Sequence, residues 1–420
     1  MDTHKTRRTP FSAPRGTTAM PVAAQVLIAG TLFSRFGDSL ASLGLVLHAA
    51  DRDIRFGVTE VMLAELIPTV LAAPLIGSLV DRFSARAVCL WALLAQSLFL
   101  GAATATGGFH VRVALIALSA LAGVASVAAG FKMLPAVAGD RHTGRANSLL
   151  TAGLSVAGLL GPPLAGFLNS RWGTGVLLGV DAVSFLVLAG CTMLAVPGSV
   201  DVSIGRRPAT KLADGYRALR DAPVVGTLMP ALAAAMVATS IESVAGVFYL
   251  RDVVNGNDTV FGLFLATWAL GSVPGALLAG RAGWADRHTL LIVGGVGGIG
   301  LGLLLTGLIP VAGVIFPLFL IAGFGNGACN VGLRNAVHTR VPAEVHGSAW
   351  ACFQALSRSC IGVGYLLGTP NSLVSSQGQV IVSGVIPLVA MAWAGLAFAR
   401  RGESTVTEPP APSTPSPPPA

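Results

Sequence analysis

Of the 420 residues in this chain, 53% are hydrophobic and only 11% are charged, which is more apolar surface than a soluble core could bury. Together with a mean hydropathy of +0.73, this composition excludes a soluble globular protein and predicts a chain that crosses a membrane many times. The net charge of +8 does not indicate nucleic-acid binding, because the basic residues recur between apolar runs and form no single patch.

The chain begins with a polar stretch, residues 1–21, that we predict to be a disordered cytoplasmic tail. A membrane span needs ~20 mostly apolar residues. Runs of that length fill residues 22–196, which we expect to fold as an N-terminal six-helix bundle. These runs fall near 22–49, 59–80, 87–106, 111–131, 147–168 and 176–196.

A polar interruption at 197–223 is predicted to be a cytoplasmic central loop. Residues 224–399 should then form a C-terminal six-helix bundle. Its runs fall near 224–250, 259–280, 289–309, 313–333, 348–368 and 379–399. The last residues, 400–420, are rich in Pro, Ser and Thr, so we predict a second disordered tail.

Lys and Arg residues favour one side of this twelve-span topology. The proposed cytoplasmic segments hold 20 of the 27, and the proposed outer loops hold Arg52, Arg55, Arg112, Arg171 and Arg251. Because Lys and Arg are retained on the cytoplasmic side, we predict a multi-pass protein of the cell (plasma or inner) membrane with both termini in the cytoplasm.

The connection between the second and third spans has a distinctive spacing, Gly77-Ser-Leu-Val-Asp81-Arg82-Phe-Ser-Ala-Arg86. By itself it is compatible with an ordinary basic cytoplasmic turn. It resembles the loop between helices 2 and 3 of the major facilitator superfamily, except that Ser84-Ala85 replaces the usual second glycine. The resemblance implies that Gly77, Asp81, Arg82 and Arg86 form a conformational latch that joins two helices in one transport state.

The fifth span carries glycines around a proline, at Gly158, Gly161, Pro162 and Gly166. Proline bends a helix and glycine lets a neighbour approach closely, so one interpretation is a generic kinked, tightly packed helix. The pattern also resembles the Gly-Pro motif of fifth helices in major facilitator exporters, which implies export.

Three further motifs extend the resemblance through most of the chain: Phe36-Gly37-Asp38, Asp181-Ala-Val-Ser184-Phe185 and Arg340-Val-Pro342-Ala-Glu344-Val-His-Gly347. They are similar to the branch that holds macrolide-efflux proteins, the enterobactin exporter and many drug exporters. The fourth span, Leu115–Phe131, lacks the Arg that many proton-driven drug exporters carry there, which weakens the carry-over of their proton relay.

Charged residues inside the spans are candidates for function, because charge is costly in hydrocarbon. Arg35 and Asp38 are three residues apart and share a helix face in the first span. Asp38 is therefore either a proton-coupling site or one half of a structural ion pair. Glu65 in the second span and Glu242 in the seventh are further proton-coupling candidates, and the alternative for Glu242 is a water-exposed outer end.

Two more charges within the spans have different expectations. Arg358, near the midplane of the eleventh span, should face a cavity or a carboxylate. It either attracts an anionic substrate group or neutralises Asp38 or Glu242. Asp181 lies near an outer helix end and is predicted to be structural.

No motif indicates an enzyme, a metal or a cofactor. Gly295-x-Gly297-x-x-Gly300 matches the dinucleotide fingerprint as a string, but it lies inside an apolar run, so helix packing explains it better. The chain has no GxxxxGK[ST], HExxH or GxSxG, and its five cysteines form no CxxC or Cys/His cluster.

The resemblance implies an all-α major facilitator fold, with twelve transmembrane helices in two six-helix bundles, and transport by alternating access. We expect a monomeric secondary transporter that exports an amphipathic drug, secondary metabolite or siderophore in exchange for protons. Its partners would be that small molecule, protons and the lipid bilayer. Two alternatives stay open: uptake or lipid translocation by the same fold, and a sensor or partner-binding membrane protein without transport.

Overall fold

The computed structural model describes residues 20–52, 54, 56–80, 83–139, 141–197, 212–281, 287–341 and 345–406. Regular structure within these residues is helical. The helices are α1 (Val22–Asp51), α2 (Gly57–Val80), α3 (Ala85–Ala105), α4 (Phe109–Ala138), α5 (Thr143–Trp172), α6 (Thr174–Ala195), α7 (Leu212–Asp221), α8 (Pro223–Asp252), α9 (Asp258–Ala279), α10 (His288–Leu308), α11 (Ala312–Arg340), α12 (His346–Leu367) and α13 (Ser376–Val406).

All of these helices except α7 have at least 21 residues, and each long helix overlaps one of the apolar runs predicted from the sequence. Within the described residues, nine are long and apolar enough to cross a membrane: α3, α4, α5, α6, α8, α9, α10, α11 and α13. The other three long helices, α1, α2 and α12, carry the charged candidates Asp38, Glu65 and Arg358. The predicted all-α membrane fold is confirmed.

The stretch predicted as a central loop contains a helix, the ten-residue α7. One face of α7 is apolar: Leu219 is fully buried, whereas Tyr216 is exposed. Gly215 lets α7 lie against α12, because a Cβ at this position would overlap the Ser348 carbonyl. The many charges of this stretch suggested a loop, but one apolar face is enough to hold a short helix against a bundle.

The structure also differs from the expectation at the C-terminus. α13 continues to Val406, past the predicted start of the tail at residue 400. Residues 1–19 and 407–420, which make up most of the two predicted tails, lie outside the described part of the chain.

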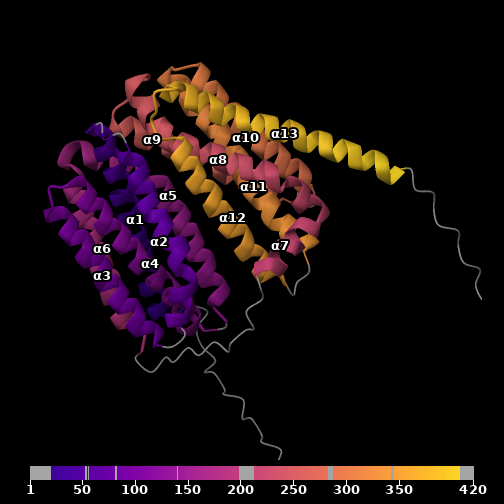
Figure 1. Cartoon of the computed structure of the whole chain (residues 1–420). Coiled ribbons are helices and arrows are strands. Elements are labelled where there is room, and N and C mark those ends of the chain that lie inside the picture. Colours follow the sequence, from indigo (N-terminus) through magenta and orange to yellow (C-terminus); the bar gives the residue numbers. More distant parts are fainter. Residues whose placement is uncertain are drawn as a thin grey trace, which may run out of the picture.

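The two halves of the chain form separate groups of helices (Figure 1). We call α1–α6 the N half and α8–α13 the C half. The outer end of the molecule is the end that holds the α1–α2, α5–α6, α8–α9 and α12–α13 connections, which are predicted to face away from the cytoplasm; the opposite end is the inner end. In Figure 1 the halves come together at the outer end and diverge toward the inner end, where α7 lies.

Close packing within the C half depends on glycine. Between α9 and α11, four glycines each lie against a backbone carbonyl of the other helix, in positions where a Cβ would overlap that carbonyl: Gly271, Gly275, Gly323 and Gly327. Helices associate in lipid through close contacts of this kind, since lipid chains are as apolar as the side chains and supply no hydrophobic driving force.

The α9–α11 contact predicts the effect of a single methyl group. Gly275→Ala would place a Cβ against the Phe324 carbonyl, a backbone atom that cannot rotate away. We expect a loss of about 1–3 kcal/mol in stability, measured as a lower melting temperature of the purified protein in detergent. Gly130→Ala in α4 is the matched control, because a Cβ there would meet no described atom within 4 Å. Equal melting temperatures for the two variants would contradict the proposed packing.

Candidate functional site

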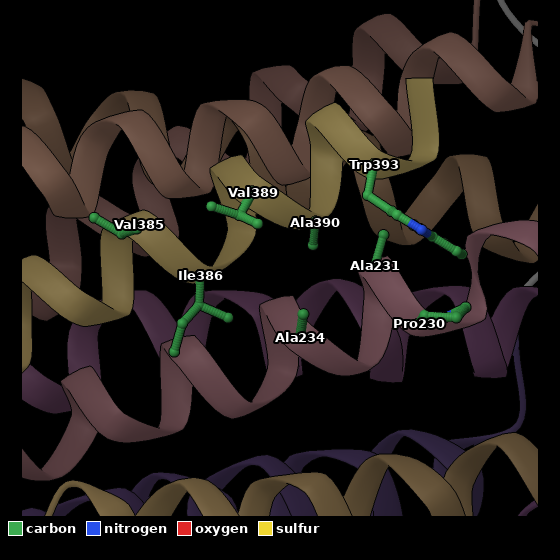
Figure 2. A pocket seen from close by; sticks show the side chains of 8 residues that line it. All are labelled: Pro230, Ala231, Ala234, Val385, Ile386, Val389, Ala390 and Trp393. Atoms are coloured by element: carbon green, nitrogen blue, oxygen red, sulfur yellow. The ribbon is translucent and has the colours of Figure 1, made fainter. Parts of the chain in front are cut away.

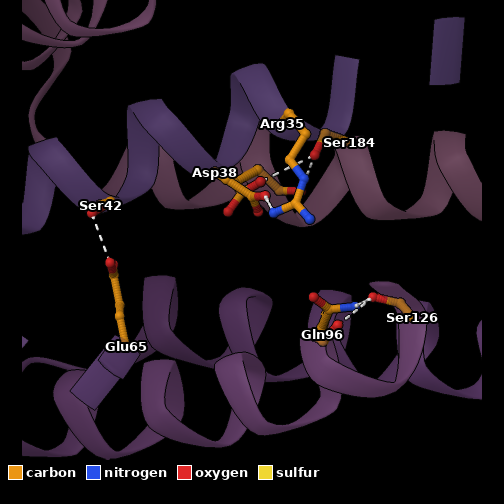
Figure 3. A network of polar contacts seen from close by, with 9 residues as sticks. Arg35, Asp38, Ser42, Glu65, Gln96, Ser126 and Ser184 are labelled. Carbon is orange, nitrogen blue, oxygen red and sulfur yellow. Dashed lines mark hydrogen bonds and ion pairs between the residues drawn. The ribbon is translucent and has the colours of Figure 1, made fainter. Parts of the chain in front are cut away.

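Arg35 and Asp38 form an ion pair on α1, with the Arg35 Nη1 atom 3.1 Å from the Asp38 Oδ2 atom (Figure 3). Their side chains are 42% and 35% exposed, although both residues lie well inside a long membrane helix. Because charged groups in contact with lipid tails are costly, we infer that this exposed surface faces the space between the halves. Asp38 is therefore in an ion pair, as its structural interpretation required. Its carboxylate is also accessible from the space between the halves, as a proton-coupling site requires.

Asp181 on α6 belongs to the same cluster. Its carboxylate is buried and accepts a hydrogen bond from the Ser184 hydroxyl at 3.1 Å. α1 touches α6 at Gly37, where a Cβ would lie 2.5 Å from the Asp181 Oδ1 atom. Asp181 interacts electrostatically with both Asp38 and Glu65. The sequence predicted a structural Asp181 near an outer helix end; its position beside Gly37 could not be predicted because it arises from the packing of α6 on α1.

Glu65 on α2 faces the same side of α1. The Ser42 hydroxyl donates a hydrogen bond to the Glu65 Oε2 atom at 3.1 Å (Figure 3). Ser42 follows Asp38 by one helical turn, so both lie on one face of α1. The structure therefore brings together two of the three predicted proton-coupling candidates, and both are in the N half.

Glu242, the third candidate, lies apart on α8 in the C half. The residue is only 8% exposed, and Gly246 on the next turn leaves room beside its carboxylate, since a Cβ there would lie 2.6 Å from Oε1. No hydrogen bond or ion pair connects Glu242 to another of the described residues. The alternative of a fully water-exposed outer end does not fit this degree of burial.

Arg358 on α12 reaches across to the other half. Its Nη1 atom donates to the Thr69 hydroxyl of α2 at 3.0 Å. The sequence suggested Asp38 or Glu242 as carboxylate partners for Arg358, and its hydrogen-bond partner in this conformation is instead a hydroxyl group close to Glu65.

Sequence reasoning missed a polar stripe on α11. Asn330 donates a side-chain hydrogen bond to Asn326 one turn earlier, and Arg334 on the following turn lies over the Trp350 ring, 5.6 Å from its centroid. Asn at four-residue spacing inside the apolar run 313–333 was the available signal. α11 therefore contributes side chains to the C half that can form hydrogen bonds.

A groove between α8 and α13 is a poor candidate for the substrate site. Its volume is about 430 Å³, and it is lined by Pro230, Ala231, Ala234, Val385, Ile386, Val389, Ala390 and Trp393 (Figure 2). Val389 and Trp393 are at least half exposed. Apart from the Trp393 indole, the lining offers no polar group that would orient a substrate.

Polar contacts join the two halves at the outer end. Arg251 of α8 forms an ion pair with Asp51 of α1 and lies 3.9 Å from Asp258 of α9. Asp258 in turn accepts a hydrogen bond from the Asn169 amide of α5 at 2.8 Å. These contacts alternate between the halves, so they hold the outer end closed in this conformation.

The Gly-Pro motif of α5 takes part in the same closure. Gly166 lies against the Asp258 backbone of α9, and Gly262 of α9 lies against the Pro162 backbone, each where a Cβ would overlap a carbonyl. Gly161 faces Ser39 of α1 within the N half, whereas a Cβ at Gly158 would meet no described atom within 4 Å. The motif therefore combines packing inside one half with close approach to the other.

Of the predicted latch, only one charged residue can be placed. Gly77 lies in the last turns of α2, and Asp81 and Arg82 lie outside the described residues. The Arg86 guanidinium donates to the Met193 carbonyl at the end of α6, at 3.0 Å. Ser84, which with Ala85 replaces the usual second glycine of the motif, is the N-cap of α3: its side chain accepts a hydrogen bond from the Ala87 N–H. Arg86 thus binds within the N half in this conformation.

The family model of the Major Facilitator Superfamily matches residues 27–369, so the chain belongs to this superfamily. It is a multi-pass membrane protein and a secondary transporter, not an enzyme. The predicted major facilitator fold is confirmed.

Two relatives are similar over most of the chain. The tetracycline resistance protein, class C, of Escherichia coli is 23% identical over 365 residues, which cover 84% of this chain and 85% of the relative. An uncharacterized MFS-type transporter, y4rN, of Sinorhizobium fredii is 27% identical over 299 residues, 67% of this chain and 71% of the relative.

Solved structures share the fold. The peptide transporter POT in complex with sulfate has a TM-score of 0.70 at 13% identity, over 93% of this chain and 96% of that one. The nucleoside transporter NupG has a TM-score of 0.68 at 14% identity, over 90% and 99%. A bacterial homolog of the lysosomal transporter Spinster, in an inward-facing and unoccupied conformation, has a TM-score of 0.64 at 14% identity, over 94% and 100%.

The outer closure predicts a reversible block of transport. The hydroxyls of Thr59 on α2 and Thr369, just after α12, are 2.8 Å apart, so we expect cysteines at both positions to bring their sulfur atoms within reach of each other for a disulfide. Oxidation of Thr59→Cys/Thr369→Cys should abolish substrate flux in proteoliposomes, and a reductant should restore it. The two single variants control for reaction with the native cysteines. Full turnover by protein shown to be cross-linked would contradict closure as a step of transport.

Proposed function

We propose that the protein is a proton-coupled exporter of an amphipathic small molecule, such as a drug, secondary metabolite or siderophore. The observation that carries the proposal is the pair of acidic residues, Asp38 and Glu65, inside α1 and α2 of the N half. Each has a polar partner close by, Arg35 and Ser42 respectively. A carboxylate that binds and releases a proton changes the charge that the membrane interior must accommodate, which gives the protein a way to couple proton movement to rearrangement.

Alternating access is the mechanism that this arrangement supports best. In major facilitators the two halves rock about a site near the bilayer midplane. Arg358 and Glu242 would bring charge to that site from the C half, and Arg35 from the N half.

Export is favoured over uptake by two observations. The first is similarity to a protein named for tetracycline resistance, because a transporter protects a cell from a drug by moving it outward. The second is the Gly-Pro motif of α5, with Gly158, Gly161, Pro162 and Gly166, which packs α5 on α9. On the motifs of α1 and α6 we place the chain in the branch of macrolide-efflux proteins and the enterobactin exporter.

We further propose a monomer in the cell membrane with both termini in the cytoplasm, on the distribution of Lys and Arg. The outer end would then face away from the cytoplasm, and the conformation described here would be inward-facing. Gly77, Asp81, Arg82 and Arg86 would close the inner end in the opposite state.

The proposal predicts a specific separation of coupling from transport. In proteoliposomes under an imposed pH gradient, wild-type protein should move amphipathic dyes or antibiotics, and a protonophore should stop this movement. Asp38→Asn should lose gradient-driven movement but retain downhill substrate movement, because the substituted amide cannot carry a proton.

Two comparison variants make the Asp38 result decisive. Glu60→Gln is the matched control, because Glu60 pairs with His110 at the partly exposed outer end of α2. Arg35→Gln/Asp38→Asn removes both members of the ion pair and guards against misfolding caused by an unpaired Arg35. Proton-driven flux that survives in folded Asp38→Asn would contradict Asp38 as a coupling site.

The same flux assay tests the alternative functions. Inward movement of the substrate would favour uptake, and movement of lipid would favour lipid translocation. No flux, together with a stable cytoplasmic partner, would favour a sensor.

The latch predicts a kinetic defect. Asp81→Asn should slow transport several-fold by weakening closure of the inner end, while expression and membrane insertion stay unchanged. The measurement is initial flux per amount of folded transporter. Wild-type turnover in this variant would eliminate the latch.

A further inference from the structure

We propose that Arg358 is the counter-charge of Glu65, binding the ionised Glu65 carboxylate across the two halves so that proton release is coupled to their relative movement. This inference rests on the proposed proton coupling and deepens it by assigning a partner on the C half. It differs from both expectations for Arg358 drawn from the sequence, which were an anionic substrate group and the carboxylates of Asp38 or Glu242.

The first step is the register of the seam between α2 and the α12 segment. Three contacts define it: Thr59 with Thr369 at 2.8 Å, Leu66 with Gly362 at 3.4 Å for an added Cβ, and Thr69 with Arg358 at 3.0 Å. As the residue number rises along α2, the number of its partner falls. The two segments therefore run antiparallel in continuous contact, and the position of each side chain along the seam is set.

The second step places Glu65 within that seam. Glu65 precedes Thr69 by four residues, and side chains at this spacing have Cβ atoms roughly 5–6 Å apart on one face of a helix. A change of Arg358 side-chain rotamer, or a slide by one helical turn of about 5.4 Å, would carry the guanidinium from the Thr69 hydroxyl toward the Glu65 carboxylate. α12 thus presents a guanidinium toward the part of α2 that holds Glu65.

The third step is the balance of charge around Glu65. α1 offers Asp38, which already binds Arg35, and the Ser42 hydroxyl. α6 adds the buried Asp181 carboxylate, which repels an ionised Glu65. The charged or titratable residues His110, Arg112 and Lys132 of α4 lie toward the two ends of that helix. Arg358 is the single Lys or Arg within α12, His346–Leu367.

These charges give the two protonation states of Glu65 different preferences. A protonated Glu65 is satisfied by Ser42, and Arg358 then rests on Thr69, as in the conformation described here. An ionised Glu65 in this setting faces two other carboxylates without a cation of its own, and an unpaired charge inside a membrane helix is costly. Binding Arg358 removes that cost and draws α2 and α12 into a different alignment. The proton on Glu65 thereby decides which alignment of the halves is favoured.

The test follows the alignment of the halves directly as pH is changed. Spin labels at Phe83, just before α3 of the N half, and at Tyr216 on α7, which packs against α12 of the C half, report the distance between the halves by double electron–electron resonance. Both residues are exposed and lie near the inner end. The measurement uses the full chain in lipid nanodiscs, with the five native cysteines replaced and proton-driven flux shown to be retained. The wild-type distance distribution should change between two populations across a single pH midpoint.

The variants have distinct expected outcomes. Glu65→Gln should remove the pH dependence and keep the population seen at low pH. Arg358→Gln should reduce the size of the pH-dependent change, because no cation on α12 is left to bind the ionised Glu65. The midpoint of the change that remains should move upward by about one pH unit or more, a tenfold change in proton concentration. Arg358→Lys should restore the wild-type midpoint to within about half a unit, since a Lys ammonium supplies the same unit charge to the ionised Glu65.

Two controls separate this pairing from other functions of Arg358. Arg171→Gln removes an equivalent charge at the outer end of α5, where the guanidinium lies 5.9 Å from the Phe167 ring, and should leave the midpoint unchanged. Thr69→Val removes the observed hydrogen bond but no charge, and it should not raise the midpoint. If Thr69→Val reproduces the effect of Arg358→Gln, the hydroxyl contact is the functional one and the inference is wrong.

Failure of this inference is distinguishable from failure of the proposed function. If wild-type flux is proton-driven but Arg358→Gln leaves the midpoint unchanged, Arg358 does not pair with Glu65, and proton coupling stands. A rise in KM confined to anionic substrates in that variant would assign Arg358 to the substrate. If Arg358→Gln does not fold, Glu65→Gln/Arg358→Gln should recover folded protein, because it removes both charges; absence of that recovery counts against the pair.

Discussion

The structure depends on the cost of leaving polar groups unpartnered in hydrocarbon. Every backbone N–H and C=O within the bilayer must be satisfied internally, which restricts the chain to long helices. The same cost applies to side chains, and several charged residues within the described helices, although not Glu242, lie beside an opposite charge or a hydroxyl group. Arg35 with Asp38, Ser42 with Glu65, and Thr69 with Arg358 are three results of that constraint.

The constraint acts differently within the halves and between them. Within the C half, α9 and α11 meet through glycines and backbone carbonyls, a contact with no space for a Cβ atom at these glycines. Between the halves, side chains carry much of the contact, as in the Arg251–Asp51 ion pair and the Thr59–Thr369 hydrogen bond. Polar side-chain contacts can be exchanged for contacts with water when the halves separate, whereas interlocked backbones cannot. This difference suits two rigid bodies that move relative to each other.

The candidate ionisable groups are distributed unevenly between those bodies. Asp38, Asp181 and Glu65 belong to three helices of the N half, whereas Glu242 and Arg358 belong to the C half. Arg358 is the group whose hydrogen bond crosses from one half to the other near the middle of the membrane helices. A charge that crosses the seam senses the protonation state of the opposite half, which is why the seam between α2 and α12 connects ion binding to movement.

The sequence by itself determined the properties that depend on one helix at a time. Apolar runs of span length located the long helices, because hydrophobic length is read residue by residue along the chain. Asp38, Glu65, Glu242 and Arg358 could be identified as candidates in the same way, because a charged residue within an apolar run is visible in the local sequence. Composition did not reveal α7, since ten residues with many charges suggest a loop until the buried contact of Leu219 is known.

Only the tertiary structure decided which of these groups meet. That Asp181 lies beside Gly37, or that Arg358 reaches Thr69, depends on how α6 packs on α1 and how α12 packs on α2. Such pairings join residues more than a hundred positions apart, and they arise from helix packing that no local pattern encodes. The closed outer end has the same origin, because the sequence does not show which charged and polar residues at the helix ends will meet. The packing of the two halves brings together Asp51, Asn169, Arg251 and Asp258.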